Sequence, residues 1–226
     1  MVSFFHHNHG KFKSCEDSLT AVIFDTLKYL PSDIFWNILK DSLYHNKLPY
    51  SSGELLSITF WDKWNSEDTK NKIYIEPDVF LRFQEFDIII EAKRRDEKQQ
   101  LSSQMIKEIT SYFNEYDADN KQLYFIQLGG LHSKKDDKNF PFKEKEVIIC
   151  KTDWSRMLHH IALTNNKLKE TDISTVNAYT RILDDCIKGF ALHQFYEKLW
   201  LKDLPIKSPI KTNPLKNYFN YAGRSQ

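Results

Sequence analysis

Apolar and polar residues alternate along two neighbouring segments, residues 73–83 and 86–93, and this alternation predicts a β-hairpin. A turn about Gln84-Glu85 would put Asp78 opposite Glu91. A turn of odd length would shift this pairing. The face that carries both carboxylates is expected to hold Tyr74, Glu76, Asp78, Phe80, Ile89, Glu91 and Lys93.

Two acidic residues on facing strands point to a metal ion. Directly opposed side chains of an antiparallel pair have Cβ atoms about 4.5–5.5 Å apart, and like charges so placed destabilise a sheet unless a cation lies between them. The alternative is an ordinary hairpin with solvated acids on its outer face. The apolar neighbours Phe80 and Ile89 on the same face argue against that alternative. The pattern therefore predicts a divalent metal site with the ammonium group of Lys93 beside it.

Periodic patterns around the hairpin predict an α/β protein with a mixed central sheet flanked by helices. Ser14 and Asp17 fit a capping box that opens a helix, which is expected to run to about Leu30, before Pro31. Glu16 would project from the buried side of this helix at its open end. The other expected elements are helices at residues 32–44 and 101–116, strands at residues 54–61, 123–128 and 146–150, and a charged loop at residues 62–72.

The last third of the chain has a helical pattern, with apolar residues at spacings of three and four in residues 154–163 and 173–199. We therefore expect three parts: a core at residues 1–152, a helical extension packed on it at residues 153–201, and a basic, proline-containing tail at residues 202–226. The tail is either a mobile, solubilising end or an arm that lies on phosphates.

The order of residues in the hairpin resembles a known catalytic signature. Pro77-Asp78, followed after twelve residues by Glu91-Ala92-Lys93, resembles the motif of the PD-(D/E)XK nuclease superfamily, which has the restriction-endonuclease-like fold. The resemblance covers roughly residues 14–150. It implies an αβββαβ core, in agreement with the order of elements predicted from the periodic patterns.

The resemblance also implies a role for each site residue. The main metal ligands would be Asp78, Glu91 and the backbone carbonyl of Ala92, with Glu16 as an additional ligand. The metal would be Mg²⁺, for which Mn²⁺ is expected to substitute. Lys93 would orient the attacking water or help to deprotonate it.

Two further sets of residues are candidates for the same site. The basic run Lys93, Arg94 and Arg95 at the end of the strand would contact phosphates, or would form only an outward-facing basic cluster. Gln104 matches a glutamine that some relatives use near the site, but it stands off the strongest apolar stripe of its helix.

Composition adds constraints without choosing a function. The chain has 226 residues and a formal net charge of +1, so any contact with DNA must come from local basic patches. The three scattered cysteines, Cys15, Cys150 and Cys186, suit a reducing cytoplasm. No apolar run long enough to span a membrane is visible, and no glycine-rich phosphate-binding loop indicates a nucleotide-driven motor.

We therefore expect a Mg²⁺-dependent deoxyribonuclease, with RNA not excluded as a substrate. A prokaryotic defence or mobile-element system, a homodimer and a protein partner encoded nearby are compatible with this expectation. Two alternatives remain open. One is a catalytically inactive nuclease fold that serves as a nucleic-acid-binding or assembly module, and the other is the nuclease subunit of a transposition machine.

Overall fold

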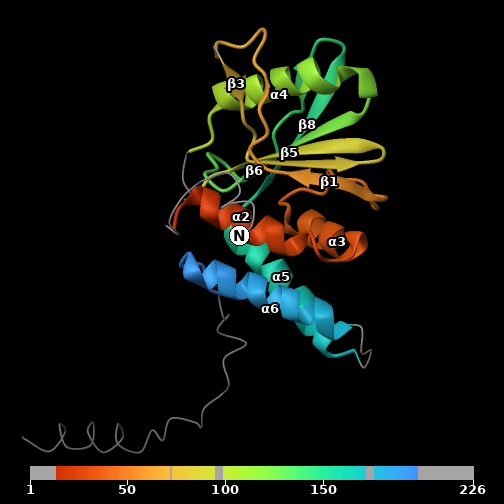
Figure 1. Cartoon of the computed structure of the whole chain (residues 1–226), viewed down its shortest axis with the longest axis vertical. Helices are drawn as coiled ribbons and strands as arrows, with labels where there is room; N and C mark the ends of the chain where they lie inside the picture. Colours follow the sequence, from red (N-terminus) through yellow and green to blue (C-terminus); the bar gives the residue numbers. More distant parts are fainter. Residues whose placement is uncertain (1–13, 72, 95–98, 172–175, 198–226) are drawn as a thin grey trace, which may run out of the picture.

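A mixed six-stranded sheet forms the centre of the protein, with helices on both faces (Figure 1). The computed structural model describes residues 14–71, 73–94, 99–171 and 176–197. The strands of the large sheet lie in the order β1 (Leu55–Thr59), β4 (Val79–Phe83), β5 (Phe86–Ala92), β6 (Gln122–Leu128), β8 (Lys145–Thr152) and β7 (Phe140–Phe142). This architecture confirms the predicted α/β class with a mixed sheet flanked by helices.

Strand β5 lies where the sheet changes from antiparallel to parallel pairing. Strands β1, β4 and β5 are antiparallel neighbours, β5 pairs with β6 and β6 with β8 in parallel, and β7 is an antiparallel edge strand. All seven residues of β5 are buried, because both faces of this central strand are covered. Its acidic residues Asp87 and Glu91 are therefore removed from water together with its isoleucines.

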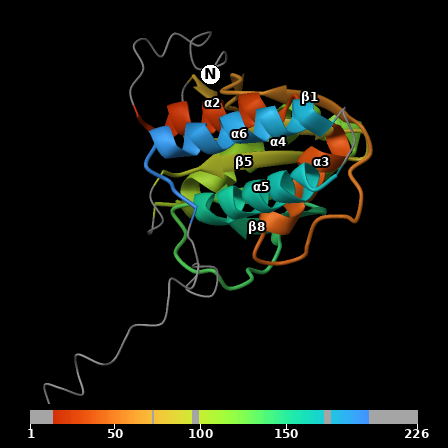
Figure 2. The same ribbon diagram turned by 90° about the horizontal axis from the view of Figure 1, so that it is seen from below.

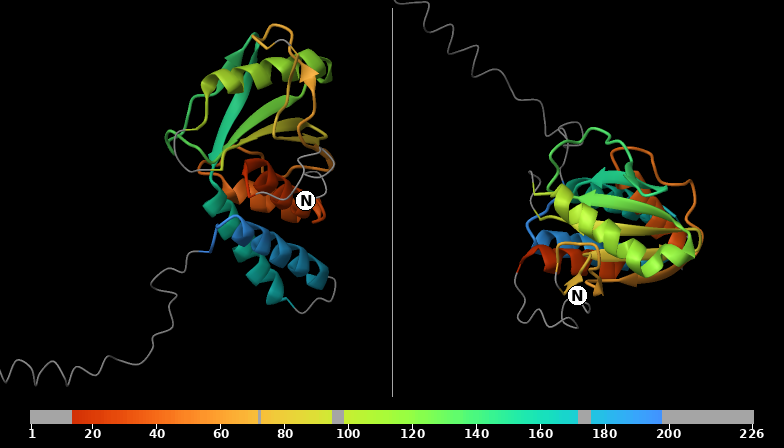
Figure 3. Two further views of the ribbon diagram at one scale, coloured as in Figure 1. Left: turned by 60° about the vertical axis from the view of Figure 1, so that its left-hand side comes forward. Right: turned by 90° about the horizontal axis from the view of Figure 1, so that it is seen from above.

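One face of the sheet is covered by helix α4 (Ser102–Tyr116), which forms the crossover between β5 and β6 (Figure 3). Its buried residues Ile109, Tyr112 and Phe113 share an apolar cluster with Phe80 and Ile89 of the hairpin. The later part of the apolar stripe predicted for this helix thus faces the sheet, whereas Leu101 and Ile106 at its start are exposed.

The other face carries two helical layers (Figures 1 and 2). Helices α2 (Glu16–Leu27) and α3 (Ser32–Ser42) lie against the sheet, and α5 (Trp154–Lys169) and α6 (Val176–Leu192) lie beneath them. Because α2 lies between the sheet and α6, it is buried on nearly every side, and not only along the predicted stripe. Gly189 allows α6 to pack closely on α2, because a Cβ atom at this position would lie 3.0 Å from Val22. The C-terminal helices share one apolar core with α2 and the sheet.

Several predicted boundaries were wrong. The N-cap of α2 is Cys15, whose backbone N–H donates to Ser18 Oγ at 3.0 Å, so the capping box does not involve Ser14 and Asp17. The helix ends at Leu27, and residues 28–30 form a turn before Pro31.

The segment predicted as one strand at residues 73–83 is interrupted at Pro77, which has no N–H to donate to a ladder. Strand β3 (Tyr74–Ile75) instead pairs with β2 (Trp64–Asn65), inside the segment predicted as a charged loop. The predicted faces therefore apply only from β4 onward.

Differences also occur toward the C-terminus. Edge strand β7 was not among the predicted strands, and the last helix ends at Leu192 rather than near residue 199. Gln194 has a φ of 69°, and the His193 N–H donates to Phe190 O, which ends the helix. The predicted tail at residues 202–226 lies outside the described residues. Within the described part of the chain, no helix is both long and apolar enough to cross a membrane.

Candidate functional site

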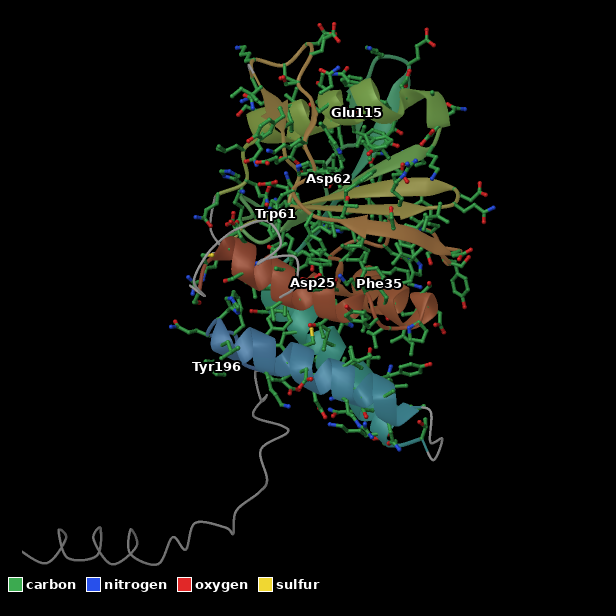
Figure 4. All side chains as sticks on the ribbon, in the orientation of Figure 1. Asp25, Phe35, Trp61, Asp62, Glu115 and Tyr196 are labelled. Atoms are coloured by element: carbon green, nitrogen blue, oxygen red, sulfur yellow. The ribbon has the colours of Figure 1, made fainter. Side chains whose placement is uncertain are left out.

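The hairpin has the predicted register, which brings Asp78 to the end of β5. The ladder pairs Val79 with Ile90, and the same register continues to the turn. Asp78 lies one residue before β4, and its Oδ2 atom accepts a hydrogen bond of 2.9 Å from the backbone N–H of Ala92. Its Oδ1 atom accepts another, of 3.2 Å, from Trp61 Nε1, and Trp61 is labelled between the sheet and α2 in Figure 4.

The predicted residues Glu91, Lys93 and Glu16 meet beside Asp78. The ammonium group of Lys93 donates to Glu91 Oε1 and, at 3.4 Å, to Glu16 Oε1. The second oxygen of Glu16 accepts a hydrogen bond of 2.8 Å from the backbone N–H of Arg94. The start of α2 and the end of β5 are thereby joined through one ion-pair cluster.

The backbone of Lys93 is held from three sides. Its N–H donates to Leu128 O at 2.7 Å, and its carbonyl accepts from Trp154 Nε1 at 3.0 Å. Gly129 and Gly130 have φ values of 72° and 60° and pack directly on Lys93. A Cβ atom on Gly130 would lie 2.7 Å from Lys93 Cβ, so only glycine fits here. The two glycines directly follow the strand predicted at residues 123–128.

Helix α4 contributes two residues to the site. Gln104 Nε2 donates to Glu91 Oε1 at 2.7 Å, although this residue stands off the strongest apolar stripe of its helix. Glu108, one turn further along, is buried, and its carboxyl group lies beside that of Glu91. Sequence reasoning missed Glu108. Its position beside Ile109, on the apolar face of the helix, is unusual for a charged residue and could have identified it from the sequence.

The electrostatics of the cluster follow from burial. Burial, and then the charge of Glu91, raises the pKa of Asp78 well above its usual range. Burial, and then the charge of Glu108, does the same for the pKa of Glu91, and burial raises the pKa of Glu108 to about 8. For Lys93, burial lowers the pKa, but the carboxylates of Glu91, Asp78 and Glu16 together raise it more. One ammonium group thus faces more carboxyl groups than it neutralises.

The donor set fits a hard divalent cation. Glu91 Oε2 and Glu108 Oε2 are both buried, and neither accepts a hydrogen bond from any described residue. Buried carboxyl oxygens without donors, in side chains that interact with each other, favour a retained proton or a bound cation. Among the described residues, no three His, Cys, Asp or Glu side chains are already arranged around a metal position. A cation would therefore compete with the Lys93 ammonium for the oxygens of Glu91 and Glu16, and carboxylate oxygens are the ligands that Mg²⁺ takes in proteins.

Of the two arginines predicted to contact phosphates, the structure describes only Arg94. The Arg94 guanidinium is bonded to Ser14, with its Nη1 atom 2.7 Å from the backbone carbonyl and its Nη2 atom 2.9 Å from Oγ. In this arrangement Arg94 fastens the start of α2 to the end of β5. Arg95 lies outside the described residues.

Comparison with known proteins establishes a family but no activity. No model of a known protein family matches the chain. The chain is 33% identical over 205 residues to the uncharacterized protein PM0110 of Pasteurella multocida (strain Pm70), and the match covers 86% of this chain and 76% of that protein. The chain therefore belongs to the same family as PM0110.

Among solved structures, a chain in an assembly of Thermococcus gammatolerans McrB AAA+ hexamers with bound McrC matches 57% of this chain and 28% of its own length. The identity is 14% and the TM-score is 0.29, and a likeness of this size does not define a shared fold.

Proposed function

We propose that this protein is a metal-dependent nuclease that hydrolyses phosphodiester bonds of DNA. The observation that carries the proposal is the meeting of Asp78 with the Glu91-Ala92-Lys93 segment, through the 2.9 Å hydrogen bond from Ala92 N to Asp78 Oδ2. A Pro-Asp and a Glu-x-Lys segment joined in this way are what the resemblance to PD-(D/E)XK nucleases requires. The ion pair of Lys93 with Glu91 also supports the proposal, because this chemistry needs an ammonium group beside the acidic residues.

The residues have distinct proposed roles. Asp78, Glu91, the Ala92 carbonyl and Glu16 would hold the metal. When bound, Mg²⁺ would supply an activated water and charge stabilisation on the phosphoryl oxygens. Gln104 fixes the orientation of the Glu91 carboxylate through its hydrogen bond.

Lys93 is proposed to act as a cation and hydrogen-bond donor rather than as a base. Its surroundings raise its pKa, so it stays protonated at neutral pH. A compact ammonium group can follow the phosphoryl oxygens as charge develops on them. The clamp on its backbone from Leu128, Trp154 and the two glycines would keep this group within reach of the reacting phosphate.

A second candidate function is a nuclease-like module that binds nucleic acid without cleaving it. The observation in its favour is that no metal cluster is preassembled among the described residues. In that case the Lys93 ion pairs would be the permanent state of the site. As for context, we propose a role in a prokaryotic defence or mobile-element system, including transposition.

The experiment that tests the proposal compares substrates and metals directly. Purified protein is incubated with supercoiled, linear and single-stranded DNA and with RNA, each with Mg²⁺, with Mn²⁺ and with a chelator. The proposal expects cleavage of at least one DNA form that requires the metal. Binding without cleavage under every metal condition would support the second candidate, and metal-independent cleavage would contradict the proposal.

A further inference from the structure

A cavity of about 350 Å³ lies directly beside the candidate site. One wall is β3 and the segment before it, with Asn71 and Tyr74, and the other is the start of α4, with Leu101, Gln104 and Glu108. Figure 1 shows β3 next to the first turns of α4. Since Gln104 bonds to Glu91 at 2.7 Å, a single side chain separates this cavity from the proposed metal ligands.

The walls of the cavity are held in place by hydrogen bonds. Lys107 Nζ donates to Asn71 Oδ1 at 2.9 Å, which joins α4 to the segment before β3. Further along α4, Glu115 Oε1 accepts a hydrogen bond of 2.6 Å from the backbone N–H of Asn65 in β2. The small β2–β3 sheet is thus fastened to α4 at two places, so the cavity does not depend on a ligand to form.

One exposed apolar residue, Leu101, lines the cavity, and another, Ile73, directly precedes the lining residue Tyr74. Leu101 is 57% exposed and Ile73, next to Tyr74, is 80% exposed. Large apolar residues that are exposed close together indicate a binding surface. Lys63 lies 4.6 Å from the centre of the Tyr74 ring, and Lys107 lines the cavity, so one cation lies against a lining ring and another in the wall.

This combination matches an unstacked nucleobase. An aromatic ring and amide groups suit a flat heterocycle with polar edges, aliphatic side chains can wedge between base steps, and nearby lysines suit the phosphates. The volume is at the lower end of small-molecule sites, about 300–1,000 Å³, and therefore suits one ring system rather than a base pair.

We propose that this cavity binds an unpaired base of the nucleotide next to the reacting phosphate, so that the protein prefers DNA with unpaired or flipped-out nucleotides. The inference rests on the proposed nuclease function, because the cavity is defined by its position beside that site. Ile73 and Leu101 separate the base from its neighbours, and Tyr74 supplies a stacking surface.

Binding, rather than cleavage, provides the test. The affinity of wild-type protein is measured by fluorescence anisotropy for a labelled duplex that carries one unpaired base and for the fully paired duplex of the same sequence, with Ca²⁺ in place of Mg²⁺. We expect the duplex with the unpaired base to bind at least about fivefold more tightly, the lower end of what stacking contributes per base. The substitutions Tyr74→Ala and Leu101→Ala should remove most of this preference while leaving binding to the paired duplex unchanged.

The matched control is Leu56→Ala in β1, because Leu56 is 55% exposed but does not line the cavity. This variant should keep the preference. An equal affinity of the wild type for both duplexes, or an unchanged preference in Tyr74→Ala and Leu101→Ala, would overturn this inference alone. If wild-type protein binds neither DNA, the nuclease proposal fails as well.

Discussion

The carboxyl groups of Glu91 and Glu108 lie buried beside each other, and the Oε2 atom of each lacks a donor among the described residues. Burial raises the pKa of both groups, that of Glu108 to about 8, and the pKa of Asp78 changes in the same direction. Folding therefore makes these groups harder to ionise. Carboxyl groups buried together in this way are stable near neutral pH only if they retain a proton or bind a cation.

The first prediction concerns stability and pH in the metal-free protein. Between the ordinary carboxyl pKa and about 8, the unfolded chain loses a proton that folded Glu108 keeps, so the free energy of unfolding falls as the pH rises. Glu108→Gln should reduce this slope, by up to about 1.4 kcal/mol per pH unit. Urea unfolding at several pH values in this window, with a chelator present, measures the slope.

The control for this measurement is Glu115→Gln, an exposed position on the same helix, which should leave the slope unchanged. An equal slope in wild type and Glu108→Gln would mean that Glu108 keeps no proton in the folded protein.

The second prediction concerns metal binding. A cation that binds only the folded protein raises the free energy of unfolding by about 2.7 kcal/mol at a hundred times its Kd. The increase produced by Mg²⁺ should be larger near pH 8 than near pH 6, because the cation competes with protons for Asp78 and Glu91. Thermal unfolding with and without Mg²⁺ at both pH values tests this. Glu91→Gln should remove the increase, and a similar increase in that variant would place the metal elsewhere.

The third prediction distinguishes Glu16 from its neighbour. Glu16 accepts hydrogen bonds from Lys93 and Arg94, whereas Asp17 is a second acidic residue in the first turn of α2. Both Glu16→Gln and Asp17→Asn lose the favourable charge at the helix N-terminus, about 0.3–1 kcal/mol. Only Glu16→Gln should also weaken Mg²⁺ binding, which titration calorimetry measures. Equal Mg²⁺ affinity in the two variants would remove Glu16 from the proposed metal ligands.

The fourth prediction concerns Gly129, one of the two glycines that pack on Lys93. Gly129→Ala puts a Cβ atom against the Lys93 carbonyl and also strains a backbone with a φ of 72°. Gly53→Ala has a similar φ of 67° but meets no described atom within 4 Å, so it should cost only about 1–2 kcal/mol. Gly129→Ala should cost clearly more and should slow cleavage, and urea unfolding with a cleavage assay compares the two. An equal loss of unfolding free energy in the two variants would mean that the close packing of Gly129 on Lys93 does not contribute to stability.

The hairpin and its register could be predicted because apolar alternation and one turn determine them locally. Asp78, Glu91 and Lys93 follow from that register, and Glu16 from its position at the open end of a helix. Glu108 could not be placed in the same way, because its contact with Glu91 depends on how α4 lies across the sheet. The burial of α2 on both sides likewise depends on α6, which is distant in the sequence.

The interruption at Pro77 illustrates the opposite error. A continuous alternating pattern was taken as one strand, although proline cannot donate to the ladder and Trp64 offered Ile75 a different partner. The cavity beside the site results from that interruption, since β3 leaves the large sheet and lies against α4. Local pattern therefore predicted which candidate site residues come together but not the surface around them.

The central claim is tested most directly by the rate of Mg²⁺-dependent DNA cleavage in wild type, Asp78→Asn, Lys93→Ala and Glu85→Gln. Glu85 is an exposed acid in the turn at the other end of the same hairpin and serves as the matched control. The account predicts that Asp78→Asn and Lys93→Ala lose at least about a hundredfold in rate, that Lys93→Ala still binds Mg²⁺, and that Glu85→Gln cleaves like the wild type. Folded Asp78→Asn and Lys93→Ala proteins that cleave DNA at the wild-type rate would contradict it.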